Sequence, residues 1–165
     1  MKVFIATSDK DFMQIVDDRI SLWNLRSSSR APEIIGPPEG EAKVGVRPDQ
    51  MVDLLALMGD SSDNIPGVPG IGEKTAAQLL GEYGSLESVL ANVENISGTK
   101  RKQNLTEHAG DARISMQLAT LHDDIDTGID LDDVFAVEAD RSRLREVANE
   151  FELRQVCLIY TSDAA

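Results

Sequence analysis

The chain has 165 residues, 41% of them hydrophobic and 27% charged, and its formal net charge is −13. This length and apolar content fit one packed domain or a large piece of one, and they exclude a disordered tail. The single Cys157 excludes an internal disulfide framework and a cysteine-rich zinc site, and no apolar run is long enough to span a membrane. Because no basic and apolar leader precedes Thr7, we expect a cytoplasmic protein.

The first predicted element is a buried parallel strand over Lys2–Thr7, a short and mostly apolar run that ends in small polar residues. Carboxylates follow it at Asp9 and Asp11, and α/β proteins place their sites at the carboxyl ends of parallel strands. An alternative interpretation makes Asp11 part of a capping box with Ser8. Capping alone would not require Asp9, so the pattern favours a site.

The next predicted elements are a helix near Asp11–Val16 and a strand near Ile20–Leu25, with Asp17 and Asp18 as solvated turn residues between them. The segment Arg26–Gly40 is rich in Ser, Pro and Gly, which predicts a crossing from a sheet-bearing part to a mostly helical part. Two or three strands cannot bury both faces of a sheet, so we expect further sequence to pack beside this part.

A helix is predicted to start at Pro48, because Pro suits the first helical position. Apolar residues recur after it at helical spacing: Met51, Leu54, Leu55 and Met58. The helix leads into Gly59–Asn64, where Asp60 and Asp63 are candidate ligands for a hard cation, since such ions prefer carboxylate oxygens. The alternative is an exposed turn before Ile65 that holds no ligand.

A glycine-rich hairpin with Gly67, Gly70 and Gly72 follows this turn and opens a helix. Glycine permits turns that leave successive N–H groups free, and the helix start adds the positive end of its dipole, so the hairpin predicts phosphate binding. Lys74 and Thr75 add a positive charge and a hydroxyl group. The alternative is a tight corner between two helices without a ligand.

Two other glycine motifs do not fit this hairpin. A nucleotide P-loop needs Lys directly after its last glycine, where this chain has Glu73. A dinucleotide-binding fingerprint needs a third glycine where this chain has Thr75. Neither nucleotide site is therefore predicted.

Helices are predicted for the rest of the chain from apolar residues at helical spacing: Glu73–Tyr83, Ser85–Asn92, Thr99–His108, Asp111–Leu121 and Asp140–Phe151. The segment 123–140 contains many acidic residues and no Lys or Arg, so we expect a solvated loop that faces away from any phosphate ligand. The basic residues instead cluster at Lys100–Lys102 and on the last helix.

These motifs resemble a known family. The run Pro66–Ala76 resembles a helix-hairpin-helix element, which grips the DNA backbone without reading bases. Together with Gly59–Asn64, it resembles the helix–three-turn–helix of the 5′-nuclease (flap endonuclease) family in its bacterial form. The run Thr7–Val16 resembles the strand-to-helix turn of the same family, and the similarity extends from about Val3 to about Gln155.

The resemblance implies an α/β fold in which the end of a parallel nuclease-type sheet is followed by a mostly helical part with the helix-hairpin-helix element. Residues 1–40 would be the C-terminal piece of the nuclease core, residues 41–155 the helical DNA-binding part, and residues 156–165 an unmatched tail. The family's other metal-binding carboxylates and its helical arch precede the position of Met1. We therefore expect this chain alone to be incomplete and to bind DNA without cutting it.

The resemblance also implies a function, the metal-dependent hydrolysis of DNA by a 5′-3′ exonuclease or flap endonuclease in replication and repair. Asp9, Asp11, Asp60 and Asp63 match the family's catalytic and metal-binding carboxylates, which hold two Mg²⁺ or Mn²⁺ ions. A monovalent cation at the hairpin is a further candidate ligand. A polymerase domain joined to the chain is a candidate partner.

The expected DNA contacts are with the backbone of a duplex that carries a 5′ flap or nick. The residues expected to make them are Gly67, Gly70, Gly72, Lys74, Thr75, Lys100 and Arg101. The alternative function is a non-catalytic helix-hairpin-helix module that only binds DNA. The presence of all four aspartates in one chain favours the nuclease.

Overall fold

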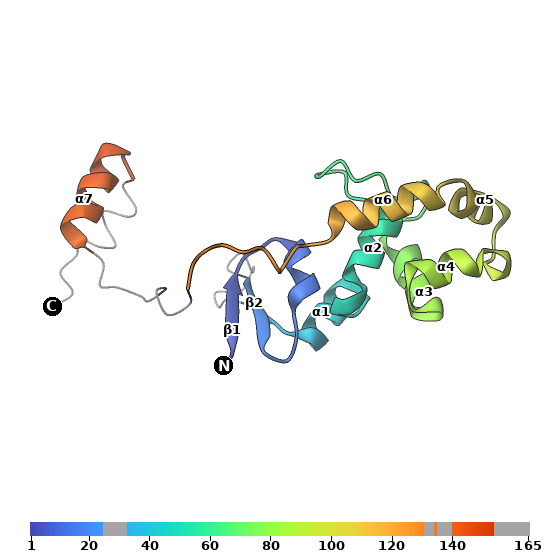
Figure 1. Ribbon diagram of the computed structural model, residues 1–165, viewed down its shortest axis with the longest axis horizontal. Coiled ribbons are helices and arrows are strands. Elements are labelled where there is room, and N and C mark those ends of the chain that lie inside the picture. Colours follow the sequence, from blue (N-terminus) through green and yellow to red (C-terminus); the bar gives the residue numbers. More distant parts are fainter. Residues whose placement is uncertain (25–32, 131–133, 135–139, 154–165) are drawn as a thin grey trace. The chain divides into compact units, whose positions relative to one another are not determined.

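The computed structural model describes residues 1–24, 33–130, 134 and 140–153 (Figure 1). The chain divides into two compact units, Met1–Asp123 and Asp124–Ala165. The division into functional parts near residue 40 stays a prediction, and the tail at 156–165 lies outside the described residues. In the part of the chain that the structure describes, no helix is long and apolar enough to cross a membrane.

A three-stranded sheet starts the first unit, with the strand order β1-β2-β3. Strands β1 (Val3–Ala6) and β2 (Ile20–Asn24) pair in parallel, as the sequence predicts, and η1 (Lys10–Ile15), a 3₁₀ helix, connects them. Strand β3 (Glu33–Ile35) pairs antiparallel to β2, and α1 (Pro37–Val44) follows it. Strand β3 and the start of α1 lie in the segment Arg26–Gly40, where the sequence predicted a crossing between the two parts. The prolines there occupy the first turn of α1, where proline is tolerated.

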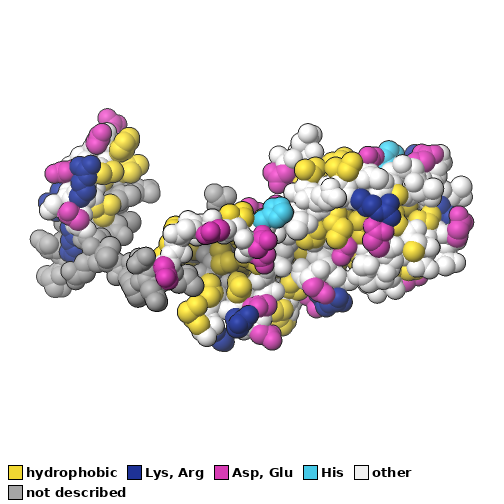
Figure 2. Space-filling model, in the orientation of Figure 1, with side chains coloured by type: hydrophobic (Ala, Val, Ile, Leu, Met, Phe, Trp, Pro, Cys, Tyr) yellow, Lys and Arg dark blue, Asp and Glu magenta, His cyan; other side chains and the backbone are white. Residues whose placement is uncertain are grey.

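The two faces of this sheet differ in burial. Leu22 and Ile35 pair in register and are almost fully buried on one face, where Met13 also lies in the core. On the other face Phe4 is 50% exposed and Trp23 41%. The prediction that the first strand is buried is therefore wrong. Figure 2 shows apolar side chains at the surface of the part that carries the strands.

The helical part of the first unit follows in chain order: η2 (Pro48–Gln50), α2 (Met51–Met58), α3 (Glu73–Tyr83), α4 (Leu86–Ala91), η3 (Val93–Asn95), α5 (Thr99–Glu107) and α6 (Ala109–Ala119). The predicted helices are present, with ends that differ by at most a few residues. Helix α2 is the most buried of them, and it packs against α3 and α6. In the second unit, α7 (Arg141–Glu150) begins after Asp140, which accepts a hydrogen bond from the amide of Arg143.

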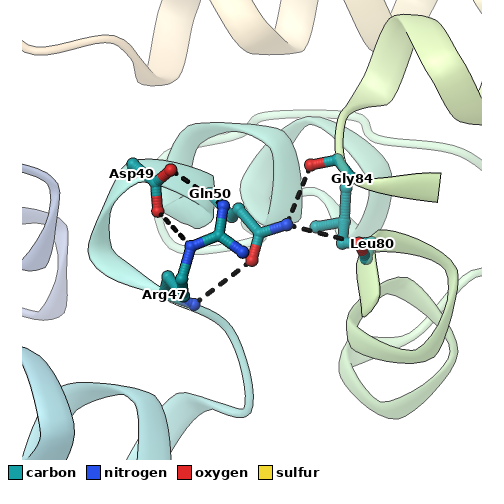
Figure 3. A network of polar contacts seen from close by, with 5 residues as sticks. All are labelled: Arg47, Asp49, Gln50, Leu80 and Gly84. Atoms are coloured by element: carbon teal, nitrogen blue, oxygen red, sulfur yellow. Dashed lines mark hydrogen bonds and ion pairs between the residues drawn. The ribbon is translucent and has the colours of Figure 1, made fainter. Parts of the chain in front are cut away.

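A polar network at the start of α2 ties this helix to the end of α3 (Figure 3). The side-chain amide of Gln50, only 5% exposed, donates to the carbonyl oxygens of Leu80 at 3.2 Å and Gly84 at 2.8 Å. In the same view, the guanidinium of Arg47 holds the carboxylate of Asp49 through two contacts of 2.9 Å, both side chains being more than half exposed. Buried and exposed polar contacts thus lie side by side.

The replacement Gln50→Leu is expected to lower the free energy of unfolding by about 1–3 kcal/mol, because buried carbonyl groups lose their side-chain donor. Asp49→Asn is the matched control, and we expect a change within about 0.5 kcal/mol because an exposed ion pair contributes little. Urea unfolding of both variants measures the difference. Equal losses would contradict this ranking of the two contacts.

Candidate functional site

The first predicted carboxylates lie where the chain leaves β1 and enters η1. Asp9 is the N-cap of η1, and its Oδ1 accepts the amide of Asp11 at 3.0 Å. The alternative interpretation, a capping box formed by Ser8 and Asp11, is therefore wrong, because Asp9 itself is the cap. Asp9 also lines a small hollow of about 70 Å³ beside Thr7 and Asn24, at the carboxyl ends of the parallel strands.

Asp60 lies in the turn that follows α2 and is 6% exposed. Its backbone pairs with Ile65 through hydrogen bonds of 2.9 and 2.8 Å, so the turn is closed on itself. Its Oδ1 accepts the amide of Ser62 at 2.8 Å, and its Oδ2 lies 2.5 Å from Nζ of Lys10. The contact with Lys10 lowers the pKa of Asp60 and raises that of Lys10, so both groups stay charged.

Asp11 has the opposite electrostatic situation. Burial raises its pKa above the usual range, and the negative charge of Asp9 adds to this effect. Within the described residues, its Oδ1 is buried and has no hydrogen-bond partner. A buried carboxylate oxygen without a donor is uncommon, and it is an atom that a ligand could satisfy.

The structure brings Asp9, Asp11, Asp60 and Asp63 into one acidic neighbourhood, since Asp9, Asp60 and Asp63 all shift the pKa of Asp11. The four carboxylates are not close enough together to form a complete metal site. In the part of the chain that the structure describes, no three His, Cys, Asp or Glu side chains are grouped so that they could hold a metal ion. Asp63 is exposed in the turn, and the ammonium group of Lys10 forms an ion pair with one carboxylate oxygen of Asp60.

The acidic turn and the glycine hairpin are in direct backbone contact. Gly59 and Gly67 have positive φ angles of 73° and 61°. A Cβ atom on Gly67 would lie 2.3 Å from the backbone nitrogen of Gly59, so no side chain fits between these two backbone segments. The amide of Val68 donates to the carbonyl of Leu57 at 2.8 Å, which fixes the hairpin to the end of α2.

The backbone amide of Gly67 is not free for the phosphate contact that the sequence predicted. This amide is buried and donates to Oγ of Ser115 on α6 at 3.0 Å. The residue therefore shapes the turn, and its N–H group is already used inside the protein. Two later glycines of the hairpin, Gly70 and Gly72, are exposed.

Gly72 is the N-cap of α3 and has an ordinary φ angle of −96°. A Cβ atom there would meet no described atom within 4 Å. The fold itself therefore gives no reason for glycine at this position, whereas the φ angle of 76° at Gly70 does. Lys74 is exposed in the first turn of α3, and the amide of Thr75 bonds to the carbonyl of Gly72 at 3.0 Å.

Lys100 and Arg101 come close to the hairpin across a long interval of sequence. With Gly70 and Gly98, they line a hollow of about 500 Å³ at the start of α5. The side chain of Asn104 donates to the carbonyl of Pro69 at 2.6 Å and so joins α5 to the hairpin. The predicted DNA-contacting residues Lys100 and Arg101, at the start of α5, therefore lie beside the hairpin residue Gly70.

Sequence reasoning missed Lys10, Ser115 and Asn104. Lys10 had a signal, because it stands between two candidate ligands. Ser115 and Asn104 had none, because each acts through one contact with the hairpin region that is 48 or 35 residues away.

Comparison with known proteins places these features in a family. A family model described as "5′-3′ exonuclease, C-terminal SAM fold" matches residues 46–142. DNA polymerase I of Bacillus caldotenax is 38% identical over 143 residues, which cover 87% of this chain and 16% of that protein. DNA polymerase I of Rhizobium leguminosarum is 43% identical over 130 residues, which cover 79% and 12%. The chain thus spans less than a fifth of the length of these relatives.

Solved structures agree on the fold. A zinc-bound T5 5′-exonuclease aligns with a TM-score of 0.65 and 24% identity, over 72% of this chain and 42% of that one. The catalytic core of Rad2 in complex with a DNA substrate aligns with a TM-score of 0.57 and 15% identity, over 96% and 56%. The predicted α/β fold, in which a small sheet is followed by a mostly helical part, is confirmed. Because the family model matches more than half of the residues, the chain belongs to the 5′-3′ exonuclease family, of which it carries the C-terminal SAM fold.

Proposed function

We propose that the chain is part of a metal-dependent 5′-3′ exonuclease or flap endonuclease that hydrolyses DNA in replication and repair. The observation that carries this proposal is the backbone contact between Gly59 and Gly67. This contact holds two turns at a fixed separation. One is the acidic turn, whose aspartates are typical cation ligands, and the other is the glycine hairpin, which is typical of phosphate binding. A phosphodiester hydrolase needs both, a cation at the reacting phosphate and a grip on the adjoining backbone.

The aspartates fit a divalent cation in their chemistry. Hard oxygen donors suit Mg²⁺ and Mn²⁺, and the unpartnered buried Oδ1 of Asp11 is the kind of atom that a cation would satisfy. Asp9, Asp11, Asp60 and Asp63 are the residues that would hold the ions. Bound ions would supply charge stabilisation at the phosphate and a more acidic attacking water. A zinc-bound T5 5′-exonuclease among the structural neighbours supports the use of divalent ions.

The DNA backbone is the ligand that we propose for the hairpin. Gly72 leaves open space where a side chain would stand, and the start of α3 presents the positive end of the helix dipole there. Lys74 adds a positive charge beside it, and Lys100 and Arg101 add more around the neighbouring hollow. The monovalent cation at the hairpin and the joined polymerase domain remain part of this proposal. The latter is supported by relatives named DNA polymerase I.

One observation favours a second function, a module that binds DNA without cutting it. Within the described residues the carboxylates do not converge into a group able to hold a metal ion. Such a module would keep the hairpin contacts and need no aspartate. Metal-dependent cleavage and its loss in aspartate variants distinguish the two functions.

Asp60→Asn and Asp63→Ala in the full-length protein that contains this sequence are expected to lower Mg²⁺-dependent cleavage of a labelled 5′-flap DNA about 100-fold or more. Duplex binding should change little, because each replacement removes an oxygen ligand and leaves the hairpin intact. Asp18→Asn is the control with the same change of charge on an exposed turn residue. Cleavage at the wild-type rate by both site variants at saturating Mg²⁺ would favour the non-catalytic module.

Lys74→Ala is expected to weaken binding about equally for all duplex sequences and to lower the slope of log K against log[salt] by about one unit. Lys43→Ala, which breaks an exposed ion pair with Glu33, is the control for loss of one positive charge. Fluorescence anisotropy over a salt series measures both. A sequence-selective loss, or an unchanged slope, would exclude a phosphate contact by Lys74.

Gly72→Val is expected to weaken DNA binding more than Lys74→Ala and to leave the fold unchanged. The Cβ atom of the new side chain meets no described atom within 4 Å, and the side chain occupies the space through which the DNA backbone would approach. Gly81→Ala on α3 is the control, since a Cβ atom there also meets no atom within 4 Å. Wild-type DNA affinity of the Gly72→Val variant would contradict close approach at this point.

A further inference from the structure

Lys10 lies at the centre of the acidic neighbourhood. Its ammonium group is 2.5 Å from Oδ2 of Asp60, whose side chain is 5% exposed, while the side chain of Lys10 is 49% exposed. The other oxygen of Asp60 accepts the amide of Ser62. Taking a carboxylate out of water is unfavourable unless a positive partner offsets it, and Lys10 is that partner for Asp60.

The neighbouring oxygens are distributed unevenly. Asp9 uses Oδ1 to accept the amide of Asp11, and Oδ1 of Asp11 is buried without a partner among the described residues. Oδ2 of Asp60 therefore has a positively charged partner, whereas Oδ1 of Asp11 has no partner among the described residues. The ammonium group of Lys10, which stands between Asp9 and Asp11 in the chain, pairs with Asp60.

A divalent cation and the ammonium group cannot share the same oxygen of Asp60. Both are positive, and at contact distance in a partly buried site their repulsion is large. A cation that binds Oδ2 of Asp60 must therefore displace the ammonium group from it. The half-exposed side chain of Lys10 can leave toward water without unfolding the turn.

We propose that Lys10 is an internal counter-cation that occupies Asp60 when no metal is bound, and that a divalent cation enters the site by exchange with it. This inference rests on the metal-binding part of the proposed function. Lys10 sets the affinity of the site for metal: the ion pair stabilises the metal-free protein and competes with the ion. It also accounts for four acidic residues that lie together without forming a finished site.

The test titrates Mn²⁺ by calorimetry into the full-length protein that contains this sequence, for the wild type, Lys10→Gln and Lys102→Gln. Lys102 is the matched control because it also pairs with a carboxylate, Glu94, and its loss changes the net charge equally. Lys10→Gln is expected to bind Mn²⁺ about three- to tenfold more tightly than either the wild type or the control. Lys10→Arg keeps the positive charge and should not show this gain. Equal or weaker binding by Lys10→Gln would overturn the exchange.

A second measurement detects the same exchange through stability. In EDTA, Lys10→Gln should lower the Tm because Asp60 loses its partner, and Mn²⁺ should raise the Tm of this variant more than that of the wild type. An equal rise in both proteins would overturn the inference, even if the variant is less stable.

Asp60→Asn separates this inference from the proposed function. If the wild type binds Mn²⁺ and Asp60→Asn does not, the metal site stands, and only Lys10→Gln decides the exchange. If Asp60→Asn binds Mn²⁺ as well as the wild type, Asp60 is no ligand, and the metal assignment fails together with the exchange.

Discussion

The burial of α2 between α3 and α6 is the interaction on which the candidate site depends. Leu54, Leu55 and Leu57 are almost completely buried, and burying a leucine side chain contributes about 1.5–3 kcal/mol. A polar group on α2 also contacts a neighbouring helix: the buried carboxylate of Asp53 accepts the amide of Leu86, the first residue of α4, at 2.9 Å. Because α2 is fixed on several sides, the position at which it ends is fixed too.

That end point decides where the candidate site residues lie. Helix α2 stops at Gly59, the acidic turn starts at the next residue, and the hairpin returns to the same place through Gly67. Helix α6 adds a second anchor by accepting the hairpin amide at Ser115. The parallel strands supply the other side of the site through η1, which contacts α2. Cation-binding and phosphate-binding residue types thus meet because backbone, rather than long side chains, joins them.

Much of this arrangement could be predicted from local patterns. The helical spacing after Pro48 located α2, and the apolar run before Thr7 located β1, because both patterns are strong within a few residues. Strand β3 was missed because three residues carry too little periodicity, and α1 because its prolines suggested a loop. Exposure of Phe4 and the ion pair of Lys10 depend on what packs beside the sheet and α2. No short window of sequence contains that information.

The open face of the sheet has a consequence for how the protein behaves in solution. Phe4, Trp23 and Ile34 present apolar surface that copies of the 165-residue chain can cover when no further sequence packs there, and its net charge of −13 keeps such copies apart. Added salt weakens this repulsion, since the screening length falls to about 8 Å at physiological ionic strength. The same salt weakens attraction between basic residues and phosphate. Colloidal stability and affinity for a polyanion are therefore coupled through ionic strength, and both decline as salt rises.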